Sequence, residues 1–167
     1  MKIQELNTLM KTFLESFYNT IELVPSMTFD EARNAGSLKA YHSSMHKSNA
    51  GYRVGSHAGS KKQALIRADY MVNDEEKFDE YYLYELILKV EKVYPELLPD
   101  DGSDHGYDYV SGMQDYELAF YKNTGEGSVD DENLSVIIID PSVIVESRMI
   151  KVLTRDELLK MQDYLYG

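Results

Sequence analysis

The stretch Tyr81–Val90, YYLYELILKV, decides the fold class because it predicts a long β-strand near the middle of the sequence. Its tyrosines and branched aliphatic residues are typical of strands. Alternate residues divide between two faces, with Tyr82, Tyr84, Leu86 and Leu88 on one and Leu83, Glu85, Ile87 and Lys89 on the other. The patterns on either side of this strand predict the elements that accompany it.

Helical patterns precede this strand. Residues 1–23 predict an amphipathic helix, ended by Pro25, with apolar residues at helical spacing: Ile3, Leu6, Met10, Phe13, Leu14, Phe17 and Ile21. A shorter helix is expected from the N-cap Thr28 to Ala35, closed by Gly36. Another begins near the cap Ser60, with its apolar face formed by Ala64, Leu65, Ala68 and Met71. These helices supply the layer that packs on the sheet.

Further strands and a last helix complete the prediction. Short strands are expected at Lys39–Ser44 and Tyr52–Ala58, and a strand pair around Glu117–Tyr121 and Leu134–Ile139, the second ended by Pro141. Residues 154–166 predict a C-terminal helix that starts at Thr154, with Glu157 in capping-box spacing. The sequence therefore predicts one α+β domain over residues 1–167, with a helical N-terminal segment (1–36), a core (38–145) and the C-terminal helix.

Composition narrows the class of protein. With 43% hydrophobic residues, the 167-residue chain can bury a core, and the absence of cysteine excludes a disulfide scaffold and a thiolate zinc site. No apolar run is long enough to cross a bilayer, and the N-terminus lacks a signal-peptide pattern, so a cytoplasmic location is expected. The formal charge of −12 fits either a solvated acidic surface or a face that docks on a basic partner.

Several familiar sites are not supported. The glycines of Gly51–Lys62 lack the spacing and the lysine of a Walker loop, and Asp100–Asp104 resembles a calcium loop only in composition. His42 and His46 have the spacing of helical metal ligands, but the intervening serines disfavour a helix. No metal site is therefore predicted.

Four motifs remain, and they follow one another in a definite order. Their residues are Tyr41-His42-Ser43-Ser44; His57-Ala58-Gly59-Ser60-Lys61-Lys62-Gln63-Ala64; Tyr82–Leu86 with Leu97–Asp101; and Tyr121–Gly127 with Ser135–Ser142. Over roughly residues 38–145 this series resembles the mono-ADP-ribosyltransferase-like domains of phages and bacteria. In that family an aromatic-His motif on the first strand is followed by a small-residue turn into a helix, a Leu/Tyr-rich strand and a late acid before Asp-Pro-Ser.

The resemblance implies a split pair of mixed and antiparallel sheets and NAD as the cofactor. It implies that His42 is both a catalytic and an NAD-binding residue, which hydrogen-bonds NAD and is supported by Tyr41 and by the hydroxyl of Ser43 or Ser44. Either Tyr52 or Tyr70 would stack on the nicotinamide ring. Glu126 would be the catalytic acid that stabilises the transition state as nicotinamide leaves.

Two positions depart from the family pattern. Ser43 stands where the family usually has glycine, and His57, included among the cofactor-binding candidates, stands where the fold often has an aromatic residue. The fold can also persist without the activity.

The resemblance implies modification of a protein target, such as a host factor in a bacterial cytoplasm. Neither nucleic acid nor membrane is an expected partner, and the oligomeric state stays open. The alternatives are a non-catalytic acidic inhibitor that binds a basic partner, and a virion or assembly component that uses the fold only as a scaffold.

Overall fold

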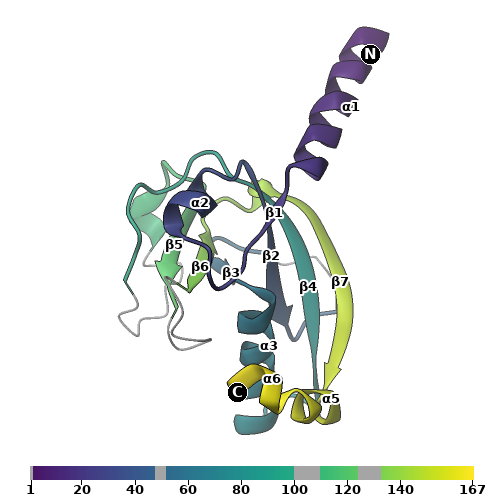
Figure 1. Cartoon of the computed structure of the whole chain (residues 1–167), viewed down its shortest axis with the longest axis vertical. Coiled ribbons are helices and arrows are strands. Elements are labelled where there is room, and N and C mark those ends of the chain that lie inside the picture. The colour runs from purple at the N-terminus through teal and green to yellow at the C-terminus, as the bar shows by residue number, and fades with distance from the viewer. Residues whose placement is uncertain (1, 48–51, 100–109, 124–132) are drawn as a thin grey trace.

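Two β-sheets form the framework of the computed structural model, which describes residues 2–47, 52–99, 110–123 and 133–167, with only the backbone described at 12–18 (Figure 1). The first sheet has the order β1-β2-β4-β7 and the second β3-β6-β5. Their bounds are Ile21–Glu22 (β1), Ser37–Ser44 (β2), Ser56–Ala58 (β3), Glu80–Lys89 (β4), Leu118–Lys122 (β5), Leu134–Ile138 (β6) and Ile144–Thr154 (β7). β1 and β2 are parallel, whereas the other pairs of neighbouring strands are antiparallel. With the helices described below, the sheets confirm the predicted α+β class.

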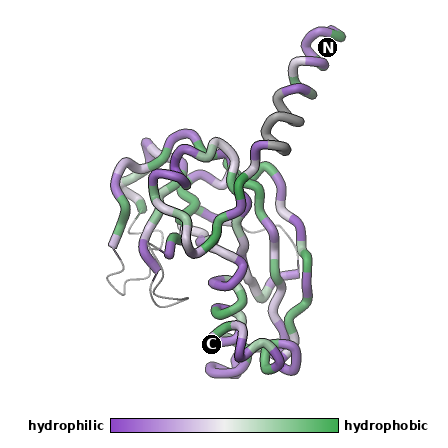
Figure 2. Tube along the Cα trace, viewed as in Figure 1, coloured by the Kyte–Doolittle hydropathy of each residue, from purple (hydrophilic) through white to green (hydrophobic). Residues whose placement is uncertain are grey.

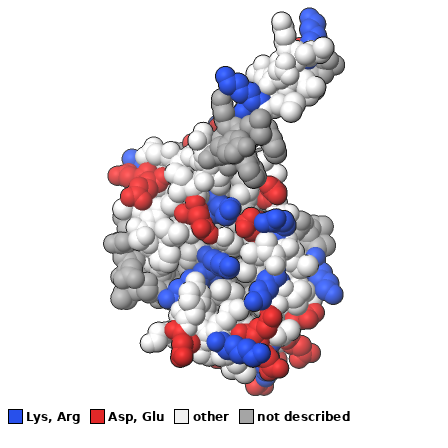
Figure 3. All heavy atoms as spheres, turned by 45° about the vertical axis from the view of Figure 1, so that its right-hand side comes forward, with Lys and Arg blue, Asp and Glu red and all other residues white. Residues whose placement is uncertain are grey.

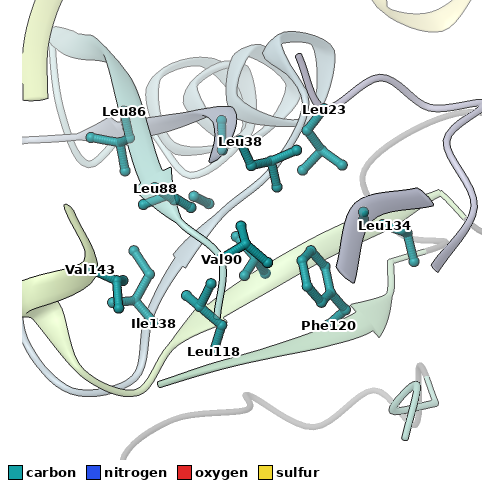
Figure 4. Close-up of a cluster of buried hydrophobic side chains, with 14 of the residues drawn as sticks. Leu23, Leu38, Leu86, Leu88, Val90, Leu118, Phe120, Leu134, Ile138 and Val143 are labelled. Atoms are coloured by element: carbon teal, nitrogen blue, oxygen red, sulfur yellow. The ribbon is translucent and has the colours of Figure 1, made fainter. Parts of the chain in front are cut away.

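The two faces of β4 bury against different partners, as its alternation predicts. Tyr82, Tyr84, Leu86 and Leu88 belong to a cluster that also contains Leu118, Phe120 and Ile138 of the second sheet, so one face of β4 lies between the sheets (Figure 4). Tyr81 and Leu83 instead pack with α3 (Lys61–Asp69) and with the C-terminal residues Leu158 and Leu165. Along β4 and β7, hydrophobic and hydrophilic residues follow one another (Figure 2). The central strand thus joins two hydrophobic clusters.

The helices cover the sheets unequally. α1 (Ile3–Tyr18) projects away from the sheets, whereas α2 (Phe29–Arg33) lies beside the second sheet (Figure 1). α3 continues into a π-helical turn, Tyr70–Asp74, and packs at its far end beside α5 (Arg155–Lys160) and α6 (Gln162–Tyr166). Two 3-10 turns, Ser111–Met113 and Pro141–Val143, connect strands. The helix caps predicted at Thr28, Ser60 and Thr154 are all confirmed, because each side chain accepts a backbone N–H of the first turn.

Four predicted elements need correction. The first helix ends at Tyr18 rather than near residue 23, because Ile21 and Glu22 pair with β2. Only Ser56–Ala58 of the predicted strand over 52–58 pairs, with β6. The turn Tyr70–Asp74 extends helical structure past Met71, the last residue of the apolar face predicted for the helix that begins near Ser60. The predicted C-terminal helix divides at Met161, and β7 was not predicted at all.

Acidic and basic side chains are interspersed over the face seen in Figure 3, without a single-sign patch that covers it. Among the described residues, no helix combines the length and the hydrophobicity that crossing a bilayer requires.

Candidate functional site

The two sheets meet where β2 passes the end of β3. Tyr41 and Gly59 exchange two backbone hydrogen bonds there, 2.8 Å from the Tyr41 nitrogen to the Gly59 oxygen and 2.9 Å in the other direction. Gly59 immediately precedes Ser60, the N-cap of α3. The junction therefore brings together the first sheet, the second sheet and the start of a helix, and His42 is the next residue along β2.

His42 is held at this junction by its own ring. Its Nδ1 lies 2.5 Å from the backbone oxygen of His57, and because a carbonyl can only accept, Nδ1 carries the proton. Burial lowers the pKa of His42 below its ordinary value, which favours the neutral ring. Nε2 then has a lone pair, and no described residue donates a hydrogen bond to it. A neutral imidazole of fixed orientation is thus able to accept one hydrogen bond from a ligand.

An aromatic residue lies against this imidazole. The ring of Tyr52 meets that of His42 edge to face, with 5.4 Å between centroids and 69° between planes. Its hydroxyl lies 2.9 Å from Ser147 Oγ on β7, and its other neighbour is the ring of Tyr84 at 6.4 Å. Burial raises the pKa of the Tyr52 hydroxyl, so this group stays protonated at neutral pH. Of the two predicted stacking residues, Tyr52 is the one beside His42.

His57 contributes its backbone to His42 and its ring to the second sheet. Its Nδ1 lies 2.8 Å from the hydroxyl of Tyr121 on β5, and the two rings pack edge to face at 5.3 Å. Through one residue, the junction is tied to both β5 and β2. His57 therefore lies in the candidate site, with its carbonyl rather than its imidazole directed to His42.

Other predicted residues are placed elsewhere. Side chains of Tyr41 and Ser43 lie on the opposite face of β2 from His42, toward α3. The Tyr41 hydroxyl donates to Glu22 at 2.5 Å. Burial is the larger cause, and this hydrogen bond the next, of a raised pKa of the Tyr41 hydroxyl. The buried Ser43 Oγ has no hydrogen-bond partner among the described residues. Ser44 shares the His42 face, and its Oγ accepts from the His46 nitrogen at 3.1 Å.

Tyr70 and Glu126 do not join the described site. Tyr70 follows the last residue of α3, about 15 Å along the helix from its start at 1.5 Å per residue, and donates to Glu75 at 2.6 Å. Glu126, the predicted catalytic acid, lies outside the described residues. It belongs to residues 124–132, which lie in the sequence between Asn123, the residue after β5, and Asn133, the residue before β6.

Sequence reasoning missed a buried polar network beside this site. Its members, which we call the Gln63 network, are Ser60, Gln63, Asn123, Asn133 and Ser135, and each is 8% exposed or less. The serine cap and a glutamine three residues later have capping-box spacing, which was a usable signal for Gln63. The contacts with Asn123 and Asn133 are long-range in sequence and carried no such signal.

The described residues contain no group of three or more His, Cys, Asp or Glu side chains that could hold a metal ion. Comparison with known proteins adds no assignment: no family model matches the chain, and no curated protein or solved structure is significantly similar to it. The site must therefore be interpreted from its own chemistry.

Proposed function

We propose that the chain is an NAD-dependent mono-ADP-ribosyltransferase, of ADP-ribosyltransferase-like fold, that modifies a protein. The arrangement of His42 carries the proposal. Its ring is fixed through the His57 carbonyl at 2.5 Å and packs on Tyr52 at 5.4 Å, and its Nε2 is left as a hydrogen-bond acceptor. A ribose hydroxyl is a donor of the kind that this nitrogen needs, and Tyr52 supplies an aromatic neighbour for a nicotinamide ring.

The remaining chemistry follows from these residues. Bound NAD would supply the ADP-ribosyl group, with nicotinamide as the leaving group. His42 would hold a ribose hydroxyl, and Tyr52 would orient the ring, so both contribute by positioning. The Glu126 carboxylate would stabilise the positive charge that develops on the ribose only in the transition state. The two separate sheets, one mixed and one antiparallel, agree with the split sheets that the fold requires.

Transfer of label from NAD to proteins of a bacterial lysate tests the proposal. We expect the wild type to label a protein, and Glu126→Gln to reduce labelling about 100-fold or more. Glu132→Gln removes a second acid from the same stretch of sequence and serves as the matched control. Undiminished labelling by Glu126→Gln would reassign the acid. Absence of both labelling and an NAD-dependent rise in melting temperature would contradict the proposed function.

The histidine can be tested by binding alone. His42→Gln should abolish the rise in melting temperature that NAD produces, because a neutral ring acceptor is replaced by a differently shaped amide. His46→Gln is the control, since His46 is exposed and contributes only its backbone to the contacts of Tyr84 and Ser44. An equal NAD response in wild type and His42→Gln would remove His42 from the site.

A second function, as an acidic protein that binds a basic partner, is favoured by where the charge lies. Residues 100–109 and 124–132 each contain four acids and no Lys or Arg, so they account for −8 of the net −12. Both stretches follow chain segments that lie side by side, because the Lys122 nitrogen donates to the Leu98 oxygen at 3.0 Å. This function predicts binding to polylysine that weakens steeply with salt and no response to NAD.

A further inference from the structure

Tyr52 is anchored to β7 by a hydrogen bond at the tip of its side chain. Its hydroxyl lies 2.9 Å from Ser147 Oγ, although the two residues are 95 positions apart in the sequence. The torsion that turns a tyrosine ring about its Cβ–Cγ bond is broad, so rotamer preference alone does not fix the plane of the ring. The bond with Ser147 holds the far end of the side chain and, together with the neighbouring rings, fixes that plane.

Ser147 differs in character from the face of β7 on which it lies. Four residues of β7 lie opposite the face of β4 that is buried between the sheets, and they are Ile144, Ser147, Met149 and Val152. Of these four, Ser147 alone carries a hydroxyl group, and it is half-buried. A hydroxyl removed from water is costly unless it makes a hydrogen bond. The contact with Tyr52 meets this requirement.

The rings on either side of Tyr52 are tethered in a different way. Tyr52 lies between His42 and Tyr84, at 5.4 Å and 6.4 Å between centroids. Both of these neighbours are bonded at 2.5 Å to backbone oxygen atoms, which any residue at the acceptor position would supply. The tether of Tyr52 is instead a side chain. Of the three tethers, the one at Ser147 therefore depends on the identity of the acceptor residue.

We propose that Ser147 is a positioning residue for NAD: it holds the ring of Tyr52 in the plane that meets the nicotinamide ring beside His42. This inference rests on the proposed function. Ser147 acts through Tyr52, so its loss should weaken NAD binding by misplacing one ring. Loss of one neutral hydrogen bond corresponds to a factor of about 3 to 10 in an equilibrium constant.

Isothermal titration calorimetry with NAD tests the role of Ser147. Ser147→Ala removes the tether, and we expect the Kd for NAD to rise about 3- to 10-fold. Ser147→Thr keeps a hydroxyl at the same position on a residue suited to strands, and its Kd should stay within about twofold of wild type. Ser26→Ala removes an exposed serine outside the site and is the matched control, which should bind NAD as wild type does. Each variant is measured well below its melting temperature.

Tyr52→Phe removes the same hydrogen bond from its other end. It should weaken NAD binding about as much as Ser147→Ala does, and the double variant should weaken it no further, because the two residues share one bond. If the loss in the double variant equalled the product of the two single losses, the residues would act separately and the inference would be overturned.

Nuclear magnetic resonance provides a readout that needs no NAD. The ring protons of His42 lie beside the Tyr52 ring, so their chemical shifts report its orientation. These shifts should change in Ser147→Ala and keep their wild-type values in Ser147→Thr and Ser26→Ala. Unchanged shifts in Ser147→Ala would overturn the inference. If the wild type binds NAD and Ser147→Ala binds it equally well, this inference alone fails. If the wild type binds no NAD, the proposed function fails, and the role of Ser147 in NAD binding fails with it.

Discussion

The two ends of α3 are both tied to distant parts of the chain, but by different chemistry. At the N-terminal end, neutral amides and hydroxyls of the Gln63 network bond to one another, and all five residues are buried. At the other end a single carboxylate, Asp69, accepts from Asn73 at 2.6 Å, Gln162 at 3.0 Å and Tyr166 at 2.7 Å. Tyr166 is 56% exposed, so water can reach the donors when a bond is lost.

This difference determines how each end responds to damage. A buried amide that loses its partner has no water to replace it, and the cost falls on every member of the network. Around Asp69 the partners are part-exposed, and water can satisfy them at small cost. We therefore expect the end of α3 nearest the candidate site to be the less tolerant one.

The largest effect should come from Gln63→Met. The change removes the bonds that Gln63 makes with the Ser60 nitrogen, the Ser135 hydroxyl and the Asn133 carbonyl, and we expect a loss of about 3 kcal/mol in the free energy of unfolding. Urea denaturation measures the loss, with the exposed Lys61→Ala on the same helical turn as the control. A cost below that of Asp69→Asn would reverse the comparison between the ends.

A somewhat smaller effect is expected for Gly59→Ala. The new methyl group would lie 2.0 Å from Gln63 Oε1, whose side chain is held on both atoms and cannot simply turn away. Overpacking of this kind should cost about 2 kcal/mol. The double variant Gly59→Ala/Gln63→Ala relieves the contact, so its cost should be less than the sum of the two single costs. If the cost of the double variant equalled the sum of the two single costs, the steric clash with Gln63 would not be the cause of the stability lost in Gly59→Ala.

At the opposite end, Asp69→Asn should cost about 1.5 kcal/mol, because a charged acceptor is replaced by a neutral amide with one acceptor oxygen. The same urea measurement applies, and Asp163→Asn on the exposed side of α6 is the control. Tyr166 offers an independent check: burial and its bond to Asp69 raise the pKa of its hydroxyl, and this elevation should decrease in Asp69→Asn. An unaltered Tyr166 titration would contradict the shared hydrogen bond.

The smallest effect concerns His42, a half-buried, neutral imidazole near the Gln63 end of α3. Its folded pKa is lowered by burial, so the unfolded chain binds more protons as the pH falls below about 6.5. Stability should therefore decrease between about pH 6.5 and the lowered folded pKa, and change no further from this group below it. Wild type should lose more stability than His42→Gln between about pH 7.5 and pH 5, and His46→Gln should behave as wild type. Equal losses in wild type and His42→Gln would mean that the ring titrates normally.

Local signals predicted much of this structure. The alternation from Tyr81 to Val90 identified β4 and its two faces, and Ser60 and Thr154 marked the starts of α3 and α5. β7 was missed because its pairing with β4 skips Ile150 and Val145, and each skip breaks the two-residue period on which strand prediction depends. The first helix was extended too far because the pairing of Ile21 with Leu38 is long-range and overrides local periodicity.

The candidate site was likewise predictable from the sequence only in part. His42 and Tyr52 could be proposed as separate residues, but the sequence offered Tyr70 as an equal candidate. Only the length of α3 places Tyr70 at the wrong end of the helix. The face of β2 likewise separates Tyr41 and Ser43 from His42. The bonds of Gln63 with Asn133 join residues 70 positions apart, which no local pattern reveals.

The contact of 2.0 Å that a Cβ at position 59 would make with Gln63 Oε1 also has a consequence for how this sequence can change in evolution. Neither position can change freely while the other stays, because a side chain at 59 excludes the amide at 63. The Gln63 amide, in turn, occupies the space next to position 59, which only a residue without a side chain leaves open. Descendants of this chain should keep the pair together or replace both, with a short residue at 63 accompanying any side chain at 59. Variant libraries randomised at these two positions would show the same linkage in a single round of selection for folding.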